Sequence, residues 1–136
     1  MMKTMILALV GCVLAGSGGV ILAEDSETTV YELRTYTTHP GRLPALNKRF
    51  RDHTVKLFEK HGMTNVMYWT PVDKESTLIY VLKHESPEAA KKSWDGFRND
   101  PDWKKAAMES EKDGKIVMKV ESVYMKTTDY SPQPKK

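Results

Sequence analysis

The order of periodic segments constrains the fold of this chain more than any other feature. From residue 28 onward, apolar residues recur alternately at the spacing of strands and at the spacing of helices. The resulting order is strand, helix, strand, strand, helix, strand, which is the ferredoxin-like β-α-β-β-α-β arrangement. We therefore predict an α+β fold in which a four-stranded antiparallel sheet carries both helices on one face. The expected strands are 28–38, 65–70, 77–83 and 115–126, and the expected helices are 43–61 and 86–113, the second with a restart at Asp100-Pro101.

Residues 1–23 have the composition of a secretory signal peptide. Lys3 is the first charged residue and Glu24 is the next, and mostly small or apolar residues lie between them. A positive start, an apolar centre and a small residue before a polar segment are typical of such peptides. We expect cleavage between Ala23 and Glu24, and hence a protein that is exported to the periplasm or secreted.

Two other interpretations of this stretch are open. The segment could stay in place as a membrane anchor, although it contains several glycines and is close to the lower length limit of a membrane span. Alternatively, Leu9-Val10-Gly11-Cys12 resembles a bacterial lipobox, in which case Cys12 would carry the lipid of a membrane-anchored lipoprotein. We expect contact with a membrane only in these two cases.

Composition excludes several classes of function. Cys12 is the only cysteine, so a chain cleaved after Ala23 has no disulfide, thiolate metal site or cysteine nucleophile. The 21 Lys+Arg and 18 Asp+Glu residues are interspersed, with a formal net charge of +3, which does not indicate a nucleic-acid-binding surface. The chain also has no Gly-rich phosphate loop, nucleophile elbow or paired-carboxylate signature. We expect a short N-terminal segment at 24–28, one domain at 29–126 and a flexible tail at 127–136.

The histidines are candidates for chemistry, and each also has a structural explanation. His53 falls on the apolar stripe of the first helix, where it could be a ligand or a general base facing a cavity, or a packed residue. His39 lies at a strand end before Pro40-Gly41, and His61 suits the end of a helix. His84 has no distinctive neighbour. No two histidines share metal-ligand spacing with a carboxylate, so we expect neither a metal site nor a cofactor. The expected stripe contains Leu46, Phe50, His53, Leu57 and His61.

The first strand places Glu32, Arg34 and Tyr36 on one face. In the space between two sheets, these side chains could bind a polar ligand, because Arg presents a planar fork to carboxylates or phosphates. The structural alternative is an ion pair with Lys119 or Glu121. Trp69 belongs to a set of aromatic residues that form either a pocket or the core. The candidate ligand-binding residues are therefore Glu32, Arg34, Tyr36, His39, His53 and Trp69, with His53 and Tyr36 as the candidates for catalysis.

Three segments taken together resemble the NIPSNAP family. They are Tyr31-Glu32-Leu33-Arg34-Thr35-Tyr36-Thr37, Pro40-Gly41-Arg42 and Leu57-Phe58-Glu59-Lys60-His61-Gly62. In addition, Asn99-Asp100-Pro101-Asp102-Trp103 resembles the family's segment between the two parts of its last helix. The resemblance spans about 30–124 and implies the dimeric α/β-barrel superfamily, with a face-to-face dimer and no securely defined activity. Unlike two-repeat members of the family, this chain has a single domain.

The fold and the resemblance lead to one expectation and two alternatives. Helices on one face leave the other face open, with part of Val30 and Tyr36 exposed, and exposed apolar surface of this kind marks an association site. We therefore expect a homodimeric, non-catalytic or weakly catalytic module that holds a small apolar or mixed ligand between the sheet and the helices. One alternative is a cofactor-independent monooxygenase, a class that the superfamily includes, with His53, Tyr36 and Trp69 at its site. The other is an interaction protein without a small-molecule site.

Overall fold

The computed structural model describes residues 25–132 and confirms the predicted order of elements. The expected cleavage site between Ala23 and Glu24, and Cys12, lie outside these residues. The strands match the predicted ranges to within two residues. None of the helices in residues 25–132 is long and apolar enough to cross a membrane. The elements are β1 (Val30–Thr38), α1 (Leu43–Arg49), the π-helical segment η1 (Phe50–Thr54), α2 (Val55–Lys60), β2 (Thr64–Trp69), β3 (Thr77–His84), α3 (Pro87–Asn99), α4 (Pro101–Ser110) and β4 (Val117–Met125).

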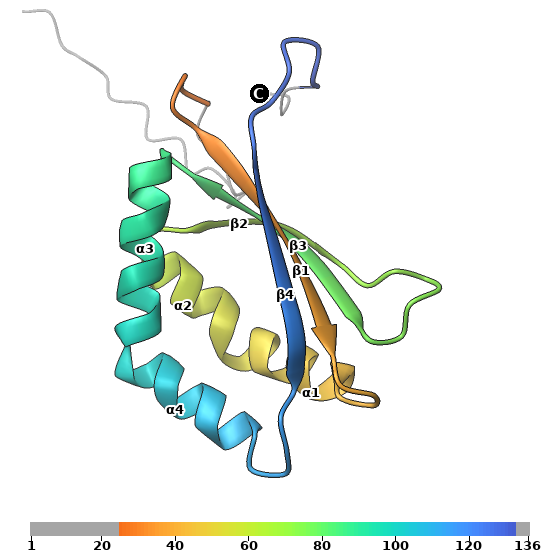
Figure 1. The fold of residues 1–136 in the computed structure, drawn as a ribbon. Helices are drawn as coiled ribbons and strands as arrows, with labels where there is room; N and C mark the ends of the chain where they lie inside the picture. Colours follow the sequence, from red (N-terminus) through yellow and green to blue (C-terminus); the bar gives the residue numbers. More distant parts are fainter. Residues whose placement is uncertain (1–24, 133–136) are drawn as a thin grey trace, which may run out of the picture.

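The four strands form one antiparallel sheet in the order β2-β3-β1-β4. All of the helices lie on one side of this sheet, as Figure 1 shows. The order and the one-sided helices together confirm the ferredoxin-like fold. β1 is a central strand, so its residues have neighbours on both sides: Arg34 is opposite Tyr80 in β3 and opposite Ser122 in β4. Polar side chains of β1 that face the helices therefore have a neighbouring strand on either side.

The last two helices begin where the sequence predicts. The Ser86 side chain accepts a hydrogen bond from the backbone N–H of Ala89 at 3.0 Å, and Pro87 occupies the first turn. Asp100 caps α4 in the same way, accepting from the N–H of Asp102 at 2.8 Å. Because Pro101 cannot donate a backbone hydrogen bond, α3 ends there and α4 starts in a new direction. This bend is visible in Figure 1.

The first helix contains a π-helical segment, which the sequence analysis did not predict. A π-turn adds one residue to the helical repeat, and the inward face after Phe50 therefore continues at Thr54, which is 1% exposed. His53 is displaced from the stripe and is exposed to solvent. The predicted position of His53 on the apolar face is thus wrong, because the prediction assumed uninterrupted α-helical spacing. The helix is followed by Gly62, whose φ of +81° is the left-handed conformation that favours glycine after a helix.

The core between the sheet and the helices is mainly aromatic. Tyr80 lies at its centre, fully buried, with ring centroids of Tyr68 at 5.1 Å, Phe50 at 5.2 Å and Phe58 at 5.9 Å. Trp94 packs against Phe58 from α3, with centroids 5.4 Å apart. Tyr68, Tyr80 and Trp94 therefore belong to the core or pack against it, whereas Trp69 does not.

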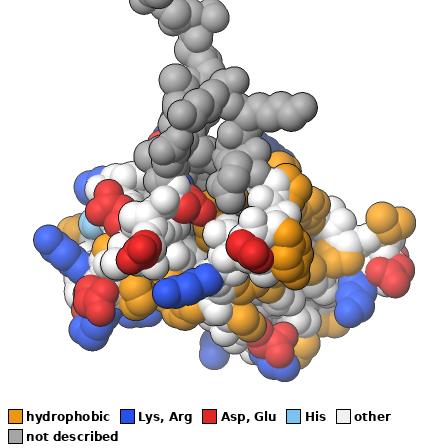
Figure 2. Space-filling model, turned by 90° about the horizontal axis from the view of Figure 1, so that it is seen from above, with side chains coloured by type: hydrophobic (Ala, Val, Ile, Leu, Met, Phe, Trp, Pro, Cys, Tyr) orange, Lys and Arg blue, Asp and Glu red, His pale blue; other side chains and the backbone are white. Residues whose placement is uncertain are grey.

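The two faces of the sheet differ from the expectation in one respect. Val30 and Tyr36 point toward the helices, so they do not belong to the open face as predicted. The error arose because alternation shows which residues share a face but not which face is covered. Hydrophobic side chains also gather to the right of centre in Figure 2, on the side where Figure 1 has the sheet. The apolar residues on the open face are Tyr31, Leu33, Met67, Trp69, Ile79, Val81, Val123 and Met125.

β4 is an edge strand that the helices leave largely uncovered. A bulge opposite Thr37 and Thr38 shifts the register, so that Val117 pairs with Thr38 and packs against the core. Beyond the bulge, Val120 and Tyr124 share the helix-facing side with Tyr36 and Glu32, yet they are 41% and 50% exposed. The helix side of β4 is therefore an accessible, partly apolar edge.

Candidate functional site

Glu32 is the centre of a buried polar cluster on the helix-facing side of β1. Its side chain is 1% exposed, and both carboxylate oxygens accept two hydrogen bonds. Oε1 accepts from His84 Nε2 at 2.9 Å and from Trp94 Nε1 at 2.7 Å. Oε2 accepts from Arg34 Nη1 at 2.7 Å and from Ser122 Oγ at 2.8 Å. Since a carboxylate has about four acceptor positions, Glu32 is fully satisfied.

These contacts decide the charge of Glu32. Burial alone would raise the pKa of its carboxyl group, but the hydrogen bonds from His84, Arg34, Trp94 and Ser122 outweigh burial and lower the pKa to about 2. Glu32 is therefore ionised at any pH near neutrality and cannot act as a general acid. Because a charged carboxylate only accepts hydrogen bonds, His84 Nε2 carries a proton. His84 Nδ1 is buried and has no hydrogen-bond partner within the described part of the chain.

Arg34 connects the carboxylate to two tyrosine hydroxyls. Its Nε donates to Tyr80 Oη at 3.0 Å and its Nη2 lies 3.4 Å from Tyr36 Oη, while Tyr80 donates to Tyr36 at 3.3 Å. The guanidinium carbon lies 4.2 Å from the centroid of the Trp94 ring, which is cation–π geometry. Burial would lower the pKa of Arg34, but Tyr36, Tyr80 and Glu32 raise it. The side chain is 15% exposed, so this end of the cluster reaches solvent.

A second buried guanidinium, that of Arg49, lies at the end of α1. Its Nη1 donates to Ser110 Oγ at 3.3 Å and lies 3.7 Å from Glu111 Oε1, and its carbon is 5.2 Å from the centroid of Trp103. Its Nε is buried and has no hydrogen-bond partner in residues 25–132. Burial is the main influence on Arg49 and lowers its pKa, against opposing contributions from Tyr36, Glu111 and Tyr80. Arg49 is therefore a buried cation with few partners.

The structure brings three of the predicted site residues together, in a different place from that expected. Glu32, Arg34 and Tyr36 adjoin one another as predicted, but they face α3 and not a space between two sheets. The expected ion pair of this strand with Lys119 or Glu121 is also wrong, because those two residues pair with each other at 3.0 Å on the opposite face.

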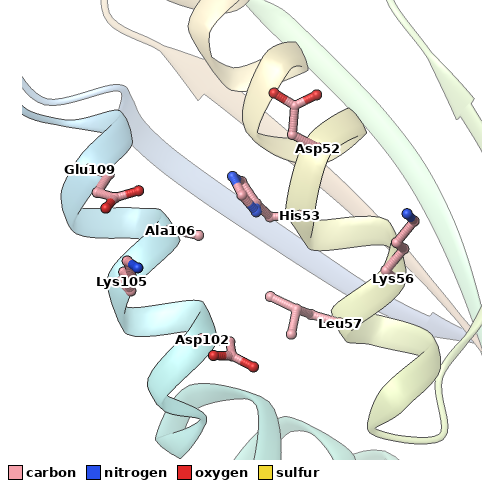
Figure 3. A pocket seen from close by; sticks show the side chains of 8 residues that line it. All are labelled: Asp52, His53, Lys56, Leu57, Asp102, Lys105, Ala106 and Glu109. Atoms are coloured by element: carbon pink, nitrogen blue, oxygen red, sulfur yellow. The ribbon is translucent and has the colours of Figure 1, made fainter.

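The other three predicted residues lie apart from this cluster. His39 follows β1, where its backbone N–H bonds to Ile116. Trp69 is on the open face of the sheet and is 48% exposed. His53 points toward α4 across a surface groove, as Figure 3 shows.

That groove consists of two adjoining hollows of about 370 and 410 Å³, which share Asp52, His53, Ala106 and Glu109. Its charges are mixed: Lys56 and Lys105 face Asp52, Asp102 and Glu109. Hydrogen bonding to Lys48 lowers the pKa of Asp52, so the nearest carboxyl group to His53 in the sequence is already engaged. The groove therefore favours no single ligand charge. Within residues 25–132, no His, Cys, Asp and Glu side chains are grouped closely enough to hold a metal ion.

The sequence analysis missed four members of the cluster: Tyr80, His84, Trp94 and Ser122. Their signal is weak, because they come from β3, α3 and β4 and meet only through the register of the sheet. The one available clue is the residue type of Glu32. A carboxylate on the covered face of a central strand must have hydrogen-bond donors near it, and His84 and Trp94 can donate.

The arrangement allows comparison with known proteins. A family model described as NIPSNAP matches residues 31–132, which includes every residue of the polar cluster. The chain belongs to the NIPSNAP family. Its tyrosine- and arginine-containing segment at 31–37, which carried the resemblance, is thus the strand that holds the buried carboxylate of this NIPSNAP domain.

Solved structures share this fold. A NIPSNAP-like domain protein from Burkholderia xenovorans has 12% identity and a TM-score of 0.69, covering 79% of this chain and 92% of that one. A NIPSNAP family protein of unknown function from Agrobacterium tumefaciens has 20% identity and a TM-score of 0.68, covering 81% and 98%. SnoaB, a cofactor-independent oxygenase from Streptomyces nogalater, has 14% identity and a TM-score of 0.56, covering 78% and 99%. At these identities the likeness shows the shared fold alone. No curated protein matches the sequence.

Proposed function

We propose that this NIPSNAP domain is an exported, homodimeric module that binds a small molecule beside Arg34. The observation that carries the proposal is the state of that side chain: its charge is held in place by Glu32 and Trp94, yet it is 15% exposed. Three of its five N–H groups are engaged by Glu32, Tyr80 and Tyr36. A rigid guanidinium with donors left over is suited to a polar group on a ligand.

The uncovered edge of β4 supplies an apolar surface next to this group. Val120 is paired with Tyr36, and Tyr124 with Glu32, on the side of the sheet that faces the helices. Both are substantially exposed. A ligand with mixed apolar and polar character could therefore contact Arg34 and this edge together.

The open face of the sheet supports the homodimer. Leu33, Val81 and Val123 lie side by side across three strands, and no element within the described residues covers them. Met67 and Trp69 extend the apolar surface and are 53% and 48% exposed. A second copy of the chain presents the same apolar surface, and self-complementary patches of this kind are typical of two-fold dimers. Export rests on residues 1–23, and mass spectrometry of the mature N-terminus tests it: a chain that begins at Glu24 supports the proposal.

An oxygenase is the alternative, because the fold is shared with SnoaB. Such a reaction needs a group that activates the substrate inside a protected cavity. The histidine predicted for this role, His53, is exposed on the helix surface, and Glu32 has no proton to give. Binding is therefore the function that the described residues support better.

Native mass spectrometry of the purified protein tests the binding proposal. We expect a small molecule to remain bound to the parent protein and to be lost from Arg34→Ala. Arg98→Ala is the matched control, because Arg98 also lies over Trp94, at 5.7 Å, but is 62% exposed. Circular dichroism should show that both variants are folded. A ligand retained by Arg34→Ala would contradict the proposal, and oxygen uptake with polyphenolic substrates would support the alternative.

A further inference from the structure

Arg34 and Arg49 lie on different elements, and Tyr36 acts electrostatically to raise the pKa of each. Arg34 lies on β1 and contacts the Tyr36 hydroxyl through Nη2. Arg49 lies at the end of α1, and the next residue in the chain, Phe50, packs its ring against Tyr36 at 5.8 Å. Each guanidinium lies over a tryptophan, Trp94 for Arg34 and Trp103 for Arg49. The molecule thus holds two largely buried cations within electrostatic range of one hydroxyl.

The charges of this region do not balance. Glu32 neutralises Arg34 at 2.7 Å, whereas the acid nearest to Arg49, Glu111, is 3.7 Å away and 38% exposed. The Arg49 side chain itself is 5% exposed. A buried charge normally has a close partner of opposite sign, because removing it from water is otherwise costly. The excess positive charge at Arg49 therefore favours an anion.

The hydrogen bonds of Arg49 lead to the same conclusion. A guanidinium has five N–H groups, and here the hydrogen bond to Ser110 Oγ is long, at 3.3 Å. Nε is buried and unpartnered within residues 25–132. Buried donors are nearly always paired, so an unpaired one calls for an explanation. A negatively charged acceptor on a bound ligand would pair with this N–H group. It would also balance the charge of Arg49.

We infer that Arg49, together with Arg34 and the hydroxyl of Tyr36, binds the carboxylate of a small organic acid whose apolar body lies against Trp103 and Val120. The inference rests on the proposed function and specifies its ligand. A carboxylate is a planar acceptor that fits the donors of a guanidinium. Val120 is the β4 neighbour of Tyr36 and is 41% exposed, so an apolar body there would remain reachable from solvent.

Isothermal titration with two probes of the same shape tests this assignment. 1-Naphthoate carries the carboxylate, and 1-naphthalenemethanol has the same ring system without the charge. We expect the parent protein to bind the acid more tightly than the alcohol. Arg49→Gln should weaken binding of the acid by about 10- to 100-fold, which is typical for loss of one charged hydrogen-bonding partner, and should leave the alcohol unaffected.

Lys48→Gln is the matched control. It removes the same charge one residue earlier in α1, where the side chain is 75% exposed and pairs with Asp52. Affinity for the acid should change less than about twofold, because exposed charges are screened by solvent. Arg49→Lys keeps the charge and should recover part of the affinity, and thermal unfolding should show that every variant is folded.

The outcomes separate the two proposals. Equal affinity for the two probes, or an Arg49→Gln variant that binds the acid like the parent, overturns the inference and leaves the proposed binding function standing. Failure of both probes to bind also overturns the inference. The proposed binding function is then tested separately, by whether a small molecule co-purifies with the parent protein and is lost from Arg34→Ala.

Discussion

At the scale of single residues, the molecule is organised around one ionised carboxylate. Glu32 accepts four hydrogen bonds that come from β1, β3, α3 and β4. Four elements therefore meet at one side chain, and the effect of changing that side chain should extend to all of them.

Glu32→Gln should destabilise the protein by about 3 kcal/mol at neutral pH. The change leaves the charge of Arg34 without its partner, and breaking a buried ion pair typically costs about 3–5 kcal/mol. Urea unfolding measures the loss. Glu121→Gln is the control, because Glu121 pairs with Lys119 on the exposed face, and it should cost less than about 0.5 kcal/mol. Equal effects of the two changes would show that the cluster contributes no special stability.

The stability of the parent protein should also fall in acid because of Glu32. Its pKa is lowered from 4.5 in the unfolded chain to about 2 in the fold. The stabilisation is therefore complete above pH 4.5 and is lost as pH falls toward 2. The difference between the parent and Glu32→Gln should narrow over this range. A difference that is constant between pH 6 and pH 3 would contradict the lowered pKa.

Gly96 gives a second prediction at this scale. A Cβ atom at this position would lie 2.8 Å from His61 Nδ1, and His61 Nε2 is 2.7 Å from Asp100 Oδ2. Gly96→Ala should thus destabilise the parent by about 1 kcal/mol. In a His61→Ala background the same change should stabilise by about 0.5–1 kcal/mol, because alanine favours helix more than glycine. Thermal unfolding of the four proteins of this cycle measures the coupling, and additive effects would refute the clash.

Side-chain partners were the part of the site that the sequence could not supply. Alternation placed Glu32, Arg34 and Tyr36 on one face of β1, and the structure confirms that they adjoin. His84 lacked any local signal, because its partner is 52 residues away and the contact depends on strand register. Residue type and periodicity report neighbours along the chain, whereas this site is assembled from neighbours across the sheet.

At the scale of elements, the boundaries were well predicted and one helical interruption was not. Pro, Gly and capping residues mark where helices begin and end, and these signals are local. η1 has no such local signal in the sequence. Its effect is to shift the inward face of the helix by one residue. The buried residues across it are Leu46, Arg49, Phe50, Thr54, Leu57 and Phe58.

Deleting Arg51 from η1 should leave a folded protein. Without one residue, the buried positions of this helix would recur at ordinary α-helical spacing, so the core contacts survive. We expect the melting temperature to change by less than about 5 °C. Deleting Lys92 from α3, which has no π-helical segment, should instead rotate Trp94 and Phe97 out of the core by about 100° and prevent folding. Loss of structure in both deletions would show that η1 is required for the fold.

At the scale of the whole molecule, one face of the sheet is packed and the other is open. Val81→Glu should convert a dimer into a monomer, because it introduces a charge at the centre of the open face of each copy. Val72→Glu is the matched control, since Val72 is fully exposed in a turn outside the sheet. Light scattering with size-exclusion chromatography measures the mass. A parent protein that is monomeric at micromolar concentration would contradict the homodimer.

The donors of Glu32 are spread along nearly the whole chain. They lie 2, 52, 62 and 90 residues away, with Ser122 as the last. During synthesis, a nascent chain that lacks β4 has a carboxylate in its forming interior without the hydrogen bond from Ser122, which opposes premature collapse. Completion of the native state must therefore wait for the final strand, so the last residues of the domain decide when its interior can close.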